Sequence, residues 1–176
     1  MDGPELGPPE DAYGRVTDPE RYAVLHDVAR GLVDDLTARY VVERFDGWHD
    51  PDLVRRVPHV VSTLRLLPAG GGAPITIALT AFPGVLARFG RWHVEPFPSC
   101  GCDACDEKPD DVAVELSRYV DAVVEGRFLE EWRGDVLRYE IRGDDRRSGT
   151  MSVLDRRTAQ ELGPPSRVEW PAWGRR

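Results

Sequence analysis

The spacing of the apolar residues changes along the chain, and this change restricts the possible folds more than any other feature. Between residues 22 and 40 apolar side chains recur every three or four positions, which is the period of an amphipathic helix. Residues 60–66 and 75–81 show the two-residue alternation of strands. The helical spacing returns at residues 112–123, and short strand-like runs follow it. This order predicts an α+β domain in which helices pack on a sheet.

The residues that flank the helical segments indicate where each helix begins and ends. Thr17 and Glu20 have the spacing of a capping box, so the first helix is expected to begin there. It is expected to run to about Glu43 and to stop by Gly47. The second helix is expected from about Asp110 to Glu125, with acidic residues in its first turn that suit the helix dipole.

The strand-like segments predict one antiparallel sheet. The first two are joined by the Gly-rich residues 68–74 and are expected to pair as a hairpin. A third strand is expected within residues 85–94, with Gly90 as a bulge or turn. Three short strands are expected after the second helix, at residues 128–132, 136–142 and 149–154. We therefore predict an antiparallel sheet of about five to six strands with two main helices packed on one face.

Composition divides the chain into a central domain and two Pro-rich ends. Residues 1–16 are acidic and rich in Pro and Gly, which predicts a partly ordered N-terminal arm. Residues 17–162 are expected to form a single α+β domain, and residues 163–176 a C-terminal tail. Trp170 and Trp173 in this tail are expected to attach it to the domain.

The charge distribution argues against a nucleic-acid partner. The formal net charge is −8 and the isoelectric point is about 5.0, with arginines scattered rather than gathered on one segment. There is no apolar run near 18 residues and no basic-then-apolar N-terminus, so we expect no membrane span and no signal peptide. The expected location is the cytoplasm, and the expected partner is a protein or a small molecule. The sequence does not indicate the oligomeric state.

All three cysteines lie between the predicted sheet and the second helix. Cys100, Cys102 and Cys105 have the spacing C-x-C-x2-C, whose second half matches a zinc knuckle. Gly101 suits a loop that folds back on itself. The motif lacks a fourth ligand, for which His93 is the preferred residue. The other candidates are Asp103, Asp106, His59 and His49.

Four interpretations of this loop remain open. A closed site of three cysteines and His93 would hold a structural zinc ion. An open site with bound water would be catalytic, with Asp106 or Glu107 as the base. A third interpretation is a tight turn without metal. The fourth is redox chemistry, because a thiol near a helix N-terminus has a lowered pKa, although the surrounding carboxylates oppose this effect.

The chain contains none of the short motifs that mark common enzyme classes. We find no nucleophile elbow, no P-loop, no dinucleotide-binding glycine pattern and no HExxH helix. We therefore predict a non-enzymatic binding or regulatory domain whose cysteine loop holds a structural zinc ion, and we assign no catalytic residue. The alternative is a zinc-dependent hydrolase with an open three-cysteine site.

The string Cys-Gly-Cys-Asp-Ala-Cys-Asp-Glu at residues 100–107, preceded by Trp92 to Pro98, resembles the hallmark of an uncharacterised actinobacterial family of small cytoplasmic proteins. The resemblance runs from Tyr22 to about Leu154. It implies a single stand-alone domain of unknown function, and it implies no catalytic residues.

Overall fold

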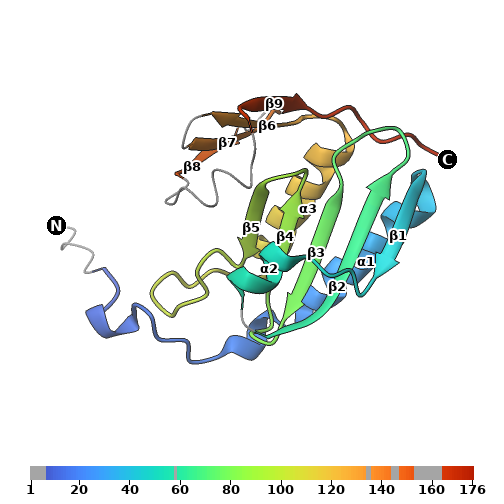
Figure 1. The fold of residues 1–176 in the computed structure, drawn as a ribbon. Coiled ribbons are helices and arrows are strands. Elements are labelled where there is room, and N and C mark those ends of the chain that lie inside the picture. Colours follow the sequence, from blue (N-terminus) through green and yellow to red (C-terminus); the bar gives the residue numbers. More distant parts are fainter. Residues whose placement is uncertain (1–6, 58, 134–135, 144–146, 153–163) are drawn as a thin grey trace.

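The structure, a computed structural model, describes residues 7–57, 59–133, 136–143, 147–152 and 164–176 (Figure 1). Its strands form two antiparallel sheets, with orders β1-β2-β3-β4-β5 and β8-β7-β6-β9. The longer helices are α1 (Val24–Arg39) and α3 (Pro109–Val124), and a short helix is α2 (Pro51–Arg56). The strands are β1 (Val42–Asp46), β2 (Val60–Pro68), β3 (Ile75–Thr80), β4 (Val85–Phe89), β5 (His93–Phe97), β6 (Phe128–Arg133), β7 (Val136–Ile141), β8 (Arg147–Ser152) and β9 (Ser166–Glu169).

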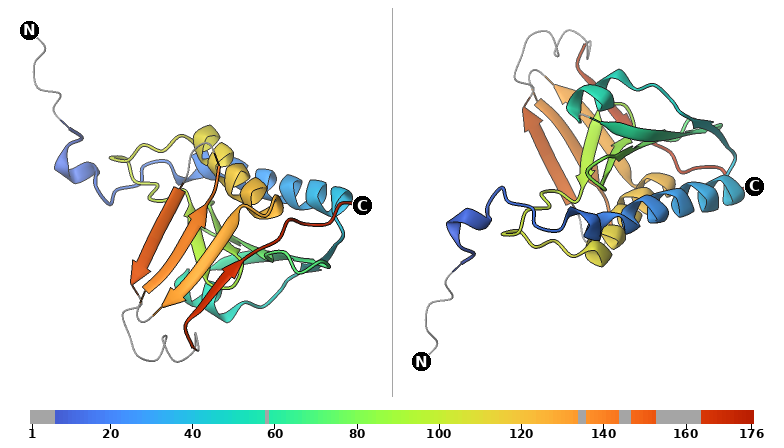
Figure 2. Two further views of the ribbon diagram at one scale, coloured as in Figure 1. Left: turned by 90° about the horizontal axis from the view of Figure 1, so that it is seen from above. Right: turned by 90° about the horizontal axis from the view of Figure 1, so that it is seen from below.

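The predicted α+β class and its two main helices are confirmed. Figure 2 shows α1 and α3 side by side along one face of the first sheet, and both helices contribute to one buried core with that sheet. The strands, however, divide between two sheets rather than forming one. The second sheet forms because β6 pairs with β7 on one side and with β9 of the C-terminal tail on the other.

The first sheet is covered on both faces, which explains why its central strand, β3, is buried along its whole length. On one face Ile75, Ile77 and Leu79 of β3 pack against the helices. On the other face Ala78 packs with Leu53 of α2 in a smaller core. All six residues of β3 are therefore buried, although large apolar side chains alternate with the smaller Thr and Ala along it.

The predicted ends of the first helix were wrong. Thr17 does not cap it, because residues 19–22 form a 3-10 turn and α1 begins only at Val24. The helix ends at Arg39 rather than near Glu43, since residues 42–46 pair with β2 as an edge strand. Sheet pairing thus outweighed the helical periodicity at this end.

The segment expected as one strand at residues 85–94 is a hairpin. Gly90 turns the chain with φ +70°, and β4 pairs with β5 across it. The hairpin expected across residues 68–74 and the three short strands after α3 are confirmed within the described residues. The predicted end of the last of these, at residues 153–154, lies outside them.

The C-terminal tail is part of the fold. Its residues 166–169 form β9, and Trp173 is 4% exposed, with its Nε1 donating to the carbonyl of Ala73 at 3.0 Å. The expected attachment through the two tryptophans is confirmed. The boundaries of the arm, domain and tail stay predictions, and residues 1–6 and 153–163 lie outside the described part.

Among the described helices, none combines the length and the apolar character that a membrane crossing requires.

Candidate metal centre

The cysteine loop connects β5 to α3, and Glu107 closes it. The Glu107 carboxylate accepts hydrogen bonds from the backbone N–H groups of Ser99 (3.1 Å) and Cys100 (2.7 Å). Gly101 has φ +77°, and a Cβ atom there would lie 3.0 Å from Phe82 Cζ. Glycine is therefore required at this bend, both for its backbone conformation and for the close approach of Phe82.

The loop brings the three sulfur atoms together. All three lie within 4.8 Å of one another, and the Sγ atoms of Cys100 and Cys102 are 3.2 Å apart. Tetrahedral zinc with bonds of about 2.3 Å to sulfur would place its sulfurs about 3.8 Å apart. The Cys100–Cys102 separation is shorter than that value and the other two are at most 4.8 Å, so small shifts of the side chains would let one ion contact all three thiolates. Cys102 is buried, while Cys100 and Cys105 are exposed.

Hydrogen bonds at the cluster make its thiols unequal. The thiol of Cys100 and the backbone N–H groups of Cys105 and Gly14 donate to the Cys102 sulfur and lower the pKa of Cys102 to about 6. Hydrogen bonds with Cys100 and Cys102 raise the pKa of Cys105 to about 12. One thiolate is thus favoured near neutral pH, and a bound cation would be needed to hold three.

The N-terminal arm lies against the same loop. The backbone N–H groups of Asp103 and Ala104 donate to the carbonyls of Arg15 (2.8 Å) and Ala12 (3.2 Å). The Asp103 carboxylate accepts from Thr17 N–H (2.9 Å), Thr17 Oγ1 (2.6 Å) and Arg15 Nε (2.9 Å). The two bonds from Thr17, then that from Arg15, lower the pKa of Asp103 to about 2. Thr17, expected as a helix cap, fastens the arm to the loop instead.

His93 lies in the aromatic core. Its ring stacks on Tyr139 with 3.7 Å between centroids and also faces Phe89 and Tyr119. Burial lowers the pKa of His93 to about 3, even though Glu95 lies 3.4 Å from its Nε2. The imidazole is therefore neutral at pH 7. The described group of clustered metal-ligating atoms contains only the three cysteines, so a role for His93 as the fourth ligand stays a prediction.

The other candidate ligands also lie outside the cysteine group. Asp103 is bonded to the arm, and Asp106 pairs with Arg21 and Lys108. His49 and His59 are exposed, the first before α2 and the second before β2. Within the described residues, the metal-ligating atoms that lie together are therefore the three cysteine sulfurs.

Glu130 on β6 is a fully buried carboxylate that was not among the residues predicted from the sequence. It accepts the backbone N–H groups of Arg91, Trp92 and His93 at 2.7–2.9 Å and Trp170 Nε1 at 3.0 Å. Burial raises its pKa, while these four donors oppose that shift. The strand period places Glu130 on the same face as Phe128 and Trp132, which was the available signal. Its hydrogen-bond donors belong to the β4–β5 hairpin and to the C-terminal tail, so Glu130 joins the second sheet to the first sheet and to the tail.

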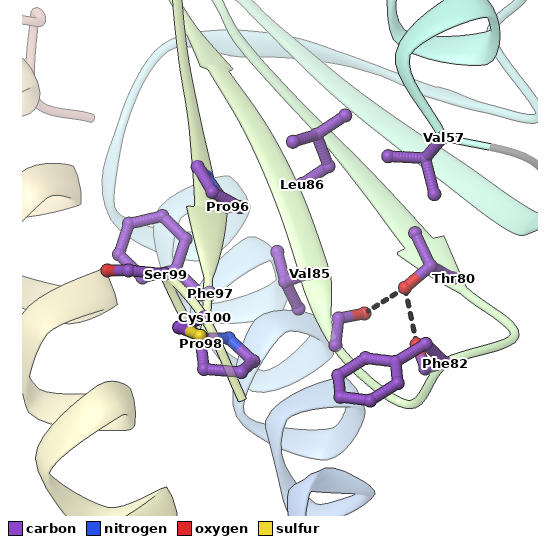
Figure 3. A pocket seen from close by; sticks show the side chains of 11 residues that line it. Val57, Thr80, Phe82, Val85, Leu86, Pro96, Phe97, Pro98, Ser99 and Cys100 are labelled. Atoms are coloured by element: carbon purple, nitrogen blue, oxygen red, sulfur yellow. Dashed lines mark hydrogen bonds between the residues drawn. The ribbon is translucent and has the colours of Figure 1, made fainter. Parts of the chain in front are cut away.

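A groove of about 220 Å³ opens beside Cys100, where the turn between β3 and β4 meets the cysteine loop (Figure 3). Among the described residues its lining contains no carboxylate, imidazole or cation, and most of it is apolar: Val57, Thr80, Phe82, Gly84, Val85, Leu86, Pro96, Phe97, Pro98, Ser99 and Cys100. The site thus consists of a sulfur cluster, covered by the arm at Cys102 and bordered by an apolar groove at Cys100.

Comparison with known proteins identifies a family without identifying an activity. The model of a family of unknown function (DUF6226) matches residues 3–176, so the chain belongs to that family. No curated protein and no solved structure matches the chain. The expectation of a family of unknown function is confirmed, while an actinobacterial origin and the cysteine string as the family hallmark stay predictions.

Proposed function

We propose that this member of a family of unknown function is a non-enzymatic binding or regulatory domain whose cysteine loop holds a structural zinc ion. The observation that carries the proposal is the convergence of three sulfur atoms within 4.8 Å in a loop that also binds the N-terminal arm. An ion there would stabilise the junction of β5, α3 and the arm at once.

The donor set favours zinc over harder cations. Thiolates are soft ligands that select zinc or copper(I), whereas magnesium and calcium prefer oxygen. Cys102 accepts N–H bonds from Gly14 and Cys105, and such bonds orient and stabilise a metal-bound thiolate. The chain thus supplies three ligands and a supporting hydrogen-bond shell for one of them.

The surroundings of the cluster support a binding role more than hydrolysis. A zinc hydrolase needs a base beside the metal-bound water. The nearby carboxylates of Asp103, Asp106 and Glu107 are each bonded to the arm, to cations or to the loop backbone. The adjoining groove is apolar and contains no ionisable group besides the Cys100 thiol. The hydrolase alternative therefore has no specific support among the described residues.

Metal analysis tests the proposal. Protein purified without a His-tag or chelator should contain about one zinc ion per chain, and its thiols should react only after the zinc is chelated. Cys102→Ser should lose the zinc, whereas Ser99→Ala, an exposed change in the same loop, should retain it. Metal-free protein with three freely reacting thiols would overturn the proposal.

The arm provides a second readout. Because the arm contacts the loop through Gly14, Arg15 and Thr17, zinc removal should speed tryptic cleavage after Arg15. Cleavage after Arg30, within α1, serves as the internal control and should not change. Zinc-loaded protein that hydrolyses ester or amide substrates, and loses this activity in Cys102→Ser, would favour the hydrolase instead.

A further inference from the structure

The cysteine cluster is exposed on one side and covered on the other. The N-terminal arm lies against the loop next to Cys102, where the backbone N–H of Asp103 donates to the carbonyl of Arg15 at 2.8 Å, whereas Cys100 and Cys105 are exposed. The described residues offer three ligands, and zinc in proteins takes four. A zinc ion at this site would therefore have one coordination position that a molecule from solution can fill.

The apolar groove borders the cysteine cluster at Cys100, which belongs to both. Figure 3 shows Cys100 beside Pro98 at one end of the groove and Phe82 across from it. Phe82 is 38% exposed, so part of its side chain is open to a molecule from solution. The cavity of about 220 Å³ is smaller than the roughly 300–1,000 Å³ of sites for drug-sized ligands, so it suits a small molecule.

The groove suits a small molecule better than an extended peptide. A peptide that adds a strand needs backbone donors and acceptors along the edge it joins. Pro96 and Pro98 have no N–H group, and the Gly84 carbonyl already accepts from Thr80 and His26. The groove edge therefore offers few partners for another backbone, while its apolar walls suit a hydrocarbon or aromatic group.

Charge indicates the kind of donor atom. Three thiolates and one divalent zinc ion carry a net charge of about −1. The described residues of the groove lining include no cation that would compensate a further negative charge. Burying an unpaired charge in an apolar site is costly, so a neutral donor fits better than a thiolate or carboxylate. Imidazole nitrogen is a neutral donor that zinc accepts readily.

We propose that a small, neutral nitrogen heterocycle with an apolar substituent binds in the groove beside Cys100 and supplies the fourth ligand of the zinc ion. This inference rests on the proposed zinc site. It assigns the apolar substituent to the walls formed by Phe82, Val85 and Phe97, and the nitrogen atom to the open coordination position.

The test uses the full chain with cobalt(II) in place of zinc, since visible cobalt absorption reports the coordinating atoms. Phenylimidazole should change the spectrum saturably, and it should bind about tenfold more tightly than imidazole because its phenyl group is removed from water. Phe82→Ala should weaken phenylimidazole several-fold while imidazole affinity and metal content stay unchanged. Val54→Ala, an exposed apolar change on α2 outside the groove lining, is the matched control.

A second variant keeps the test decisive if Phe82→Ala does not fold. Ser99→Phe adds bulk at the exposed rim of the groove and should exclude phenylimidazole more than imidazole. Equal affinities for the two probes, or a cobalt spectrum that neither probe changes, would overturn this inference and leave the metal site intact. Protein that binds no metal would overturn both proposals.

Discussion

The two ends of the described chain are attached to the domain in opposite ways. The C-terminal tail is attached by burial: β9 pairs with β6, Trp173 enters the main core, and Trp170 donates to the buried Glu130. The N-terminal arm is attached mainly by polar bonds: exposed side-chain bonds to Asp103, and backbone bonds from Asp103 and Ala104 to the carbonyls of Arg15 and Ala12.

This difference indicates which of the two ends stays attached to the domain without a metal ion. Burial of an aromatic side chain contributes several kcal/mol, whereas exposed ion pairs contribute at most about 1 kcal/mol each. The tail is therefore part of the cooperative fold. The arm is held weakly by the chain alone, and a metal ion at the adjacent cluster is what would strengthen it.

The largest expected effect follows from Trp173→Ala. This change removes a buried ring from the main core and its hydrogen bond to Ala73, so the free energy of unfolding should fall by about 3–5 kcal/mol. Guanidinium denaturation measures it. Trp48→Ala is the control, because Trp48 is 37% exposed and mainly contacts Phe45 and Arg65; its cost should be about 1 kcal/mol or less. Equal costs would refute the contrast between buried and surface attachment.

The second prediction concerns Glu130, the buried carboxylate to which the tail residue Trp170 donates. Glu130→Gln keeps the shape of the side chain but replaces an acceptor oxygen with a donor, which leaves buried N–H groups without an acceptor. The free energy of unfolding should fall by about 1–3 kcal/mol. Glu131→Gln, on the next residue of the same strand and partly exposed, should change little. A neutral result for Glu130→Gln would mean that the tail depends on apolar burial alone.

The pH dependence of stability tests whether His93 is a buried, neutral residue of the core. Its folded-state pKa of about 3 lies below the unfolded value of about 6.5, so the unfolded state binds more protons between these values. Stability is then complete above pH 6.5 and falls by about 1.4 kcal/mol per pH unit toward pH 3. His93→Phe should flatten this dependence in denaturation experiments, while His49→Gln at an exposed site should not.

His93→Phe also tests the prediction from the sequence that His93 is the fourth zinc ligand. Because His93 packs among aromatic rings, His93→Phe should keep the zinc content of the wild-type protein. Loss of zinc, with the fold retained, would instead restore His93 as the fourth ligand.

The smallest expected effect concerns the arm. Asp103→Asn removes the charge that Arg15 and Thr17 contact, so tryptic cleavage after Arg15 should accelerate a few-fold in metal-free protein, with global stability unchanged. Asp27→Asn, which breaks an exposed pair with Arg30, is the charge-matched control. A large loss of global stability in Asp103→Asn would show that the arm belongs to the cooperative fold.

Local spacing predicted much of this protein. The helical period located α1 and α3, and the Gly-rich hairpin joined β2 to β3, because these features depend on neighbours a few residues apart. The convergence of the cysteines was predictable for the same reason: Cys100 and Cys105 are five residues apart in one loop. The position of Glu130 between Phe128 and Trp132, at strand spacing, also placed its carboxylate on the apolar face of β6.

The tertiary structure alone decided the remaining features. β1 replaced the end of a helix because β2 lay beside it, and β9 returned from the far end of the chain to complete the second sheet beside β6. His93 entered the core because Tyr119 and Tyr139, distant in sequence, stack on it. Spacing determines which residues share one segment. The partners of a segment depend on the burial of surface that the whole chain achieves together.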